Sequence, residues 1–190
     1  MGDMNNPESG SELAKQSRII FINGTSSSGK TTIARELQKG IPEPFCYYAS
    51  DQLADQGFRS RKAFANAPSE RERFFDGFHR SIAAFCEAGN DLIVEHIVEE
   101  QSWADDLIRL LSPFDVFWVG VHAPVEELDR REEARGNRRP GEARFHLKTH
   151  RYVQYDVEVD STVPLRLGAG ADHFSVARTA ACEYFFSGRN

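Results

Sequence analysis

The residues that most clearly could do chemistry form the stretch GTSSSGKT at positions 24–31, which fits the pattern GxxxxGK[ST] at every fixed position. Its glycines let successive backbone N–H groups turn inward without clashes, so that the loop can hold phosphate oxygens. Lys30 would then reach the β- and γ-phosphates of ATP, and Thr31 would offer its hydroxyl to Mg²⁺. The alternative is a flexible turn that carries this pattern by chance. The expected phosphate-binding residues are Gly24, Thr25, Ser26, Ser27, Ser28, Gly29, Lys30, Thr31 and Thr32.

The segments on either side of this loop favour the first interpretation. Residues 18–22, RIIFI, form a short apolar run typical of a strand that is covered on both faces. From Lys30 onward, apolar residues recur at helical spacing until Gly40 ends the pattern. A strand, a glycine turn and a helix in this order are the context in which the pattern binds nucleotide phosphates. The loop is therefore interpreted as a phosphate cradle.

Strands and helices alternate along the rest of the chain. This alternation predicts an α/β fold of three layers, with a five-stranded, mainly parallel sheet flanked by helices. The loops at the carboxyl ends of parallel strands share one edge, so the cradle, Asp51, Glu95, His96 and His122 are expected to meet there. The further strands are predicted near 45–48, 92–94, 116–121 and 155–159, and the further helices near 69–89, 103–111, after Pro124 and over 172–186.

Three residues at predicted strand ends are candidates for chemistry. Asp51 could orient an acceptor hydroxyl and take its proton, since the hydroxyl becomes acidic only late in a loose phosphoryl-transfer transition state. Its alternative role is to cap a helix that begins near Gln52. Glu95 could hold Mg²⁺, usually through water, or could be a solvated acid only. His96 could orient the substrate, although a lone histidine in such a loop is more often simply hydrogen-bonded.

An arginine-dense segment at 129–144, DRREEARGNRRPGEAR, is interpreted as a lid. Its glycines and proline bound a hinged stretch, which would let Arg135 and Arg138 close over the nucleotide phosphates. Arginine suits this task because its charge is fixed and its planar donors match phosphate oxygens. The helix before the hinge carries two i, i+4 pairs that predict a solvated face, Glu126 with Arg130 and Glu127 with Arg131.

The chain resembles the chloramphenicol phosphotransferase family of P-loop kinases over most of residues 18–163, in the segments GTSSSGK, SDQL, AGNDLIVEH, DVFWVGVHAP, RREEARGNRRPG and HRYVQYDVEVDST. The resemblance implies a nucleotide-kinase fold with a five-stranded parallel sheet, and ATP with Mg²⁺ as phosphate donor. It also implies transfer of the γ-phosphate to a primary hydroxyl of chloramphenicol, an antibiotic-resistance activity. It assigns the proton acceptor to Asp51 and the lid arginines to Arg135 and Arg138. Residues 54–73, which would wall the acceptor site, match the drug-modifying enzyme poorly.

These observations favour an ATP-dependent phosphotransferase that acts on a small hydroxylated molecule, with Lys30, Asp51, Arg135 and Arg138 in catalysis and Thr31 and Glu95 at the metal. A different acceptor, such as a nucleotide, a sugar or another natural product, stays open. A nucleotide-binding module that regulates a partner without catalysis is a further alternative. The chain has neither an NKxD motif nor a DxxG segment, which argues against a guanine-nucleotide switch.

Composition limits the other possibilities. The 190 residues, 40% of them hydrophobic, fit a single kinase domain over 18–190. Residues 1–17 contain no apolar run, so we expect a disordered tail on a cytoplasmic protein rather than a secretory signal or a membrane span. The net charge of -6 argues against a general nucleic-acid binder. Three widely spaced cysteines argue against a disulfide framework or a zinc site. The oligomeric state is left open.

Overall fold

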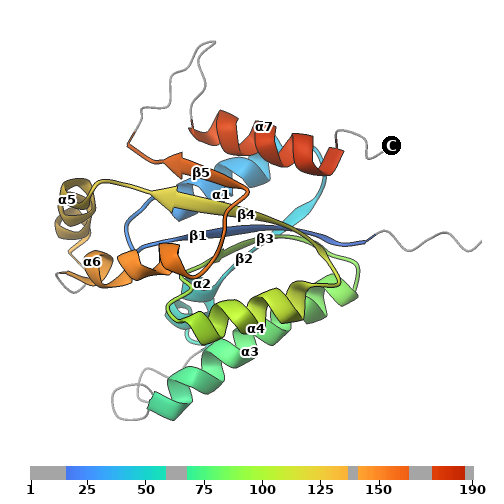
Figure 1. Cartoon of the computed structure of the whole chain (residues 1–190), viewed down its shortest axis with the longest axis horizontal. Coiled ribbons are helices and arrows are strands. Elements are labelled where there is room, and N and C mark those ends of the chain that lie inside the picture. The colour runs from blue at the N-terminus through green and yellow to red at the C-terminus, as the bar shows by residue number, and fades with distance from the viewer. Residues whose placement is uncertain (1–15, 59–67, 137–140, 163–172, 187–190) are drawn as a thin grey trace, which may run out of the picture.

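A five-stranded parallel sheet forms the centre of the molecule, as the sequence predicts (Figure 1). The computed structural model describes residues 16–58, 68–136, 141–162 and 173–186. Every neighbouring pair of strands is parallel, and the strand order is β2-β3-β1-β4-β5, so β1 lies in the middle. The strands are β1 (Arg18–Gly24), β2 (Phe45–Ala49), β3 (Asp91–His96), β4 (Asp115–His122) and β5 (Val157–Asp160).

Helices cover both faces of this sheet and give the three predicted layers (Figure 1). Helices α1 and α7 lie on one face, α3 and α4 lie on the other, and α5 and α6 lie at the end toward which β4 points. Helix α2 agrees with the helix near Gln52 that the sequence leaves open, whereas the pattern does not predict α6; each is under two turns long. The helices are α1 (Lys30–Gly40), α2 (Ser50–Asp55), α3 (Pro68–Glu87), α4 (Gln101–Leu111), α5 (Val125–Arg135), α6 (Glu142–His146), the 3₁₀ helix η1 (Leu147–Arg151) and α7 (His173–Phe186).

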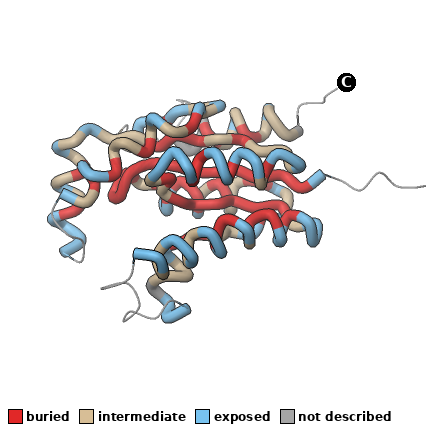
Figure 2. Tube along the Cα trace, turned by 60° about the horizontal axis from the view of Figure 1, so that its bottom comes forward, coloured by how far each residue is buried: buried red, intermediate tan, exposed pale blue. Residues whose placement is uncertain are grey.

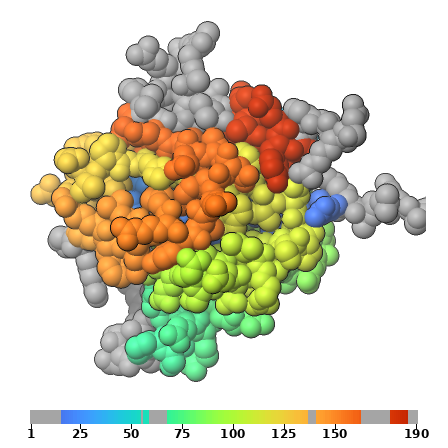
Figure 3. Space-filling view, viewed as in Figure 1, coloured from blue at the N-terminus to red at the C-terminus, as the bar shows by residue number. Residues whose placement is uncertain are grey.

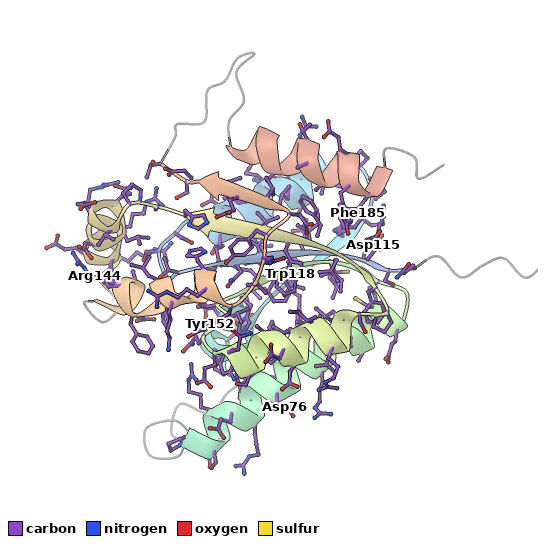
Figure 4. The ribbon with its side chains drawn as sticks, in the orientation of Figure 1. Asp76, Asp115, Trp118, Arg144, Tyr152 and Phe185 are labelled. Atoms are coloured by element: carbon purple, nitrogen blue, oxygen red, sulfur yellow. The ribbon has the colours of Figure 1, made fainter. Side chains whose placement is uncertain are left out.

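The side chains of β1 alternate between two hydrophobic clusters. Ile19 and Phe21 pack with α3 and α4, whereas Ile20 and Ile22 pack with α1 and α7. All four side chains have no exposed surface, and the tube is red along the central strands in Figure 2. Trp118 of β4, labelled in Figure 4, packs on Phe21 with ring centroids 4.3 Å apart. Because successive strand residues face opposite sides, an unbroken apolar run is what a central strand requires.

An ion pair holds the amino-terminal ends of β1 and β3 together. Asp91 accepts hydrogen bonds from the Arg18 backbone N–H at 2.8 Å and from its Nε at 3.0 Å, and also pairs with its Nη2. The two side chains are only 7% and 9% exposed. The neighbouring Ser17, the last residue of the predicted tail, is buried and donates its hydroxyl to Cys86 O at 2.7 Å. Ser17 is therefore part of the packed domain, and residues 1–15 lie outside the described residues.

Three further findings concern the cysteines, metal-binding groups and membrane spans. Cys46, Cys86 and Cys182 are free cysteines. Among the described residues, no group of three or more histidine, cysteine, aspartate or glutamate side chains is placed to hold a metal ion. In the same part of the chain, no helix has the length and apolar character that crossing a membrane requires.

Removal of the Asp91 carboxylate should destabilise the domain strongly. Asp91→Ala leaves a buried guanidinium without its counter-charge, which costs roughly 3–5 kcal/mol of unfolding free energy. Asp76→Ala is the matched control, because Asp76 pairs with Arg80 at 2.9 Å on the exposed face of α3; its cost should stay below about 1 kcal/mol. Urea unfolding of the three proteins measures both values. Equal, small losses would contradict a structural role for the buried pair.

Candidate phosphoryl-transfer site

The loop between β1 and α1 has the tight backbone path that the glycine pattern predicts. Gly29 has a φ of 96°, and Ser27 has a φ of 60°, a conformation that is uncommon for residues with a Cβ atom. A Cβ at Gly24 would lie 2.4 Å from the carbonyl oxygen of Val121, so only glycine fits where β1 passes this part of β4. The loop is therefore held in one shape by its neighbours, and its residues Thr25, Ser26, Ser27 and Ser28 are all buried.

Three buried hydroxyls in this loop point to an anionic ligand. Within the described parts of the chain, the Oγ atoms of Ser26, Ser27 and Ser28 have no hydrogen-bond partner. Buried polar atoms in native proteins are nearly always paired, so these three are expected to bind something else. The first turn of α1 follows directly and brings the positive end of the helix to the same place. The Lys30 ammonium donates to Thr25 O at 2.8 Å. These residues suit a phosphate chain, which would exchange that bond for one to a phosphate oxygen.

A carboxylate and a hydroxyl meet beside the loop, as predicted for a metal site. Thr31 Oγ1 donates to Glu95 Oε1 at 2.8 Å, and Tyr47 donates its hydroxyl to the other oxygen, Oε2. Burial and the hydrogen bond to Glu95 both raise the pKa of Tyr47. Mg²⁺ prefers oxygen ligands and usually takes only one or two from the protein. The pair of Thr31 and Glu95 fits such an ion, whereas Thr32 makes no such contact with the residues that the structure describes.

Asp51 follows the carboxyl end of β2 and lines a cavity beside the phosphate loop. The cavity is lined by Ser26, Ser27, Gly29, Lys30, Thr31, Asp51, Glu95, Ile97 and Arg135. The alternative role for Asp51 as a helix cap is wrong, because α2 begins at Ser50 and Asp51 is inside its first turn. The structure thus brings together the cradle, Asp51, Glu95 and Arg135, which are far apart in the sequence. Arg138 lies outside the described residues.

The base of the predicted lid is tied to the cradle. Glu132 of α5 is buried and accepts hydrogen bonds from Gly141 N at 2.8 Å and Ala143 N at 2.7 Å. Thr25 donates its hydroxyl to the carbonyl oxygen of Ala143. Arg144, labelled in Figure 4, pairs with an oxygen of Asp129 at 2.6 Å. The residues that follow the predicted hinge, 141–144, are therefore anchored both to α5 and to the phosphate loop.

The segment after the lid is fixed to the end of β1. Figure 3 shows α6, η1 and β5 in orange as a continuous surface that borders α4. Thr149 Oγ1 lies 2.8 Å from Asn23 Oδ1 and 2.7 Å from Val98 O, and its single hydroxyl hydrogen is donated to one of these two acceptors. Asn23 Nδ2 donates to the Tyr155 hydroxyl at 2.7 Å. Because Asn23 immediately precedes Gly24, this buried network holds the entrance to the cradle.

Arg131 is a site residue that sequence reasoning misses. The pattern assigns it to an exposed pair with Glu127, and this pair exists, with Nε to Oε1 at 2.6 Å. However, its Nη1 also donates to Ser27 O at 3.3 Å and to Ser161 Oγ at 2.8 Å, and its Nη2 donates to Ser161 O at 3.0 Å. The prediction for Arg130 is wrong in its partner, because Arg130 pairs with Glu127 rather than Glu126. A spacing rule on one helix gives no signal for contacts to two distant loops.

The histidines are not part of the cavity. His96 is 2% exposed, and its Nε2 lies 3.1 Å from His79 Nε2 while its Nδ1 lies 3.0 Å from Ser50 Oγ. Burial lowers the pKa of His79 to about 4, and burial also lowers the pKa of His96. His96 therefore orients Ser50, the neighbour of Asp51, and its predicted alternative of simple hydrogen bonding is what the structure shows. His122 stacks on another histidine, and its Nε2 lies 2.7 Å from Glu158 Oε2.

Loss of Arg131 should loosen the cradle. Arg131→Ala removes the charge-assisted bonds to Ser27 and Ser161, and each such bond is worth about 1.5–3 kcal/mol, so nucleotide affinity should fall at least tenfold. Arg130→Ala is the matched control, since Arg130 lies next to it on the exposed side and pairs only with Glu127 among the described contacts. Titration with a fluorescent ATP analogue gives both affinities. Equal affinity of the two variants would contradict the contact role.

The buried histidine pair should make stability depend on pH. The unfolded His79 titrates near its ordinary pKa of 6.5, whereas burial keeps the folded pKa near 4 despite Asp76 and Asp106 nearby. Below pH 6.5 only the unfolded chain takes up the proton, so stability falls as the pH drops toward 4. From pH 7 to pH 5 the wild type should lose on the order of 2 kcal/mol more than His79→Gln in urea unfolding. Parallel pH profiles would contradict this origin.

The chain is similar to known proteins of one family. The model of the family described as "CPT: Chloramphenicol phosphotransferase-like protein" matches residues 17–166. A Mycobacterium tuberculosis protein named "Putative O-phosphotransferase Rv2636" is 28% identical over 174 residues, which cover 77% of this chain and 76% of that protein.

Solved structures agree on the fold. The tunicamycin resistance protein of Deinococcus radiodurans has a TM-score of 0.63 at 19% identity, covering 90% of this chain and 96% of that one. The APS kinase CysC of Mycobacterium tuberculosis, solved with AMPPNP and APS, has a TM-score of 0.60 at 16% identity, covering 89% and 97%. The fold is that of P-loop kinases, and the chain belongs to the chloramphenicol phosphotransferase-like family.

Proposed function

We propose that this protein transfers the γ-phosphate of ATP to a hydroxyl group of a small molecule. One observation carries the proposal: a single cavity joins the phosphate loop, the carboxylates of Asp51 and Glu95, and the guanidinium of Arg135. These are the parts that phosphoryl transfer requires, namely a phosphate cradle, a metal position, a group for the acceptor proton and a cation for the transferring charge. The family match and the kinase fold support the same reaction class.

The cradle would hold the donor. The hydroxyls of Ser26, Ser27 and Ser28, with the loop amides, offer hydrogen bonds to phosphate oxygens, and Lys30 supplies a positive charge at the β- and γ-phosphates. Thr31 and Glu95 are the residues that would hold Mg²⁺. When bound there, Mg²⁺ neutralises charge that builds on the phosphate oxygens during transfer. Tyr47 fixes the far oxygen of Glu95, so the near oxygen stays beside Thr31.

Asp51 would act on the acceptor. The acceptor oxygen forms a bond to the γ-phosphorus while the bond from that phosphorus to the β–γ bridging oxygen breaks, so ADP leaves with the bond electrons. The acceptor proton passes to the Asp51 carboxylate and from there to solvent. A strong base is not required, because the proton moves late and orientation of the acceptor is the main contribution of the carboxylate. The position of Asp51 at the cavity, rather than its basicity, thus supports this role.

Arg135 and the lid would complete the site. Arg135 is the last residue of α5 and lines the cavity, so its guanidinium can face the transferring phosphoryl group. Arg138 is expected to join it, from the sequence pattern. A lid of this kind keeps water away from the γ-phosphate and so suppresses ATP hydrolysis. Chloramphenicol is one candidate acceptor, through the family; a nucleotide, a sugar or another natural product are the others.

Asp51→Asn should separate transfer from nucleotide binding. The amide keeps the size of the side chain but cannot take the proton, so acceptor-dependent ADP release should fall roughly 10²- to 10⁴-fold. The dissociation constant for an ATP analogue should stay within about threefold, because Asp51 acts on the acceptor rather than on the loop. A coupled ADP-release assay and a binding titration measure the two effects.

Asp76→Asn on the exposed face of α3 is the control and should leave both values unchanged. Full turnover by Asp51→Asn would remove Asp51 from the mechanism. Tight nucleotide binding with no ADP release from any acceptor would instead favour a non-catalytic regulatory module.

A further inference from the structure

A second cavity lies beside the one that the phosphate loop lines, and the two cavities share three lining residues. Thr31, Asp51 and Glu95 line both cavities, so a molecule in the second cavity would lie next to Asp51 and to the predicted phosphate site. Its volume is about 250 Å³, which is below the roughly 300–1,000 Å³ of sites for drug-sized ligands. It is lined by Thr31, Arg35, Tyr47, Ala49, Asp51, Gln52, Gln56 and Glu95. If the proposed function holds, the acceptor hydroxyl comes from this side.

The lining residues are almost all polar. Ala49 is the one aliphatic residue among them, and the ring of Tyr47 is covered by the guanidinium of Arg35, whose carbon lies 3.9 Å from the ring centroid. Gln52 lies in α2, and Gln56 follows the end of this helix four residues later. The amide groups of both side chains offer donors and acceptors to hydroxyl groups.

The charged groups of this cavity have different tasks. Glu95 accepts a hydrogen bond from Thr31 with one oxygen and from Tyr47 with the other, so both of its oxygens are paired within the site. Arg35 is exposed, and its hydrogen bond to Gln38 Oε1 is long, at 3.4 Å. The carboxylates of Glu95 and Asp51 raise the pKa of the Tyr47 hydroxyl electrostatically, whereas the Arg35 guanidinium lowers it, so charges of both signs surround this hydroxyl. The lining of the cavity thus carries two carboxylates, of which Glu95 is paired, and one guanidinium.

We propose that the acceptor is a small polyhydroxylated acid, with its carboxylate or phosphate group bound by Arg35, its hydroxyls bound by Gln52 and Gln56, and one hydroxyl held by Asp51. The guanidinium presents a planar set of donors that matches both kinds of anion. Thr31 and Arg35 lie one turn apart on α1, so the helix that begins at the phosphate loop would also set the distance between the acid group and the transferred phosphate. This inference rests on the proposed function.

The test is an ADP-release assay with matched pairs of acceptors. Four- to seven-carbon hydroxy acids and sugar phosphates are compared with the neutral sugars or alcohols of the same length, and chloramphenicol is included. The best acid should have a kcat/KM at least tenfold above its neutral partner. Arg35→Gln should lower that value ~10- to 100-fold, the effect of one charge-assisted interaction, and leave the neutral partner unchanged. Carboxylates and phosphates in separate arms show which anion is preferred.

Lys39→Gln is the matched control, because Lys39 lies on the same helix, is exposed and pairs with Glu36 at 2.8 Å. It should leave the preference for acids intact. Preference for a neutral compound or for chloramphenicol, no turnover of any acid, or an equal effect of Arg35→Gln on acids and neutral compounds would each overturn the inference. Titration of the same samples with AMPPNP decides whether the proposed function falls as well: it does so only when the nucleotide fails to bind or no acceptor at all is turned over.

Discussion

The structure depends on a loop in which three buried serine hydroxyls lack partners within the described protein. Ser26, Ser27 and Ser28 keep buried hydroxyls without hydrogen bonds there, a state that costs free energy unless a ligand supplies acceptors. The loop is held in this state by its frame. Gly24 passes against the backbone of β4 too closely for any side chain, and β1 before it is buried along its whole length. Such a frame keeps the cradle ready for an anion, so little binding energy is needed for reorganisation.

The same loop connects the elements that must act together. Thr25 bonds to the segment after the lid, Arg131 bonds to the loop from the helix before the lid, and Glu132 joins these two sides. A phosphate bound by the loop would therefore lie next to residues that are hydrogen-bonded to the segments on both sides of the predicted lid. On the sheet side, Thr31 contacts Glu95 at the end of β3. The phosphate loop, the segments on both sides of the predicted lid and the proposed metal ligands are thus linked by direct hydrogen bonds.

The sequence predicts the sheet well and the site in part. The five strands and the long helices follow from apolar runs and helical spacing, and the glycine pattern predicts the cradle because its chemistry needs a continuous stretch. The order β2-β3-β1-β4-β5 then brings Asp51 and Glu95 to one cavity. Arg131, Tyr47 and Arg35 are missed, since their contacts arise only when distant segments meet. His96 ends a strand as a candidate would, but its ring turns into the core, because the last residue of a strand can face either layer.

The central claim is that this loop grips a triphosphate while Asp51 faces the outermost phosphorus. The most direct test is a crystal structure of the protein with AMPPNP and Mg²⁺. The account predicts β- and γ-phosphate oxygens within about 3 Å of Lys30 Nζ and of the loop amides and serine hydroxyls, with the Asp51 carboxylate on the open side of the γ-phosphorus. A nucleotide bound elsewhere, or an Asp51 side chain directed away from the γ-phosphate, would contradict it.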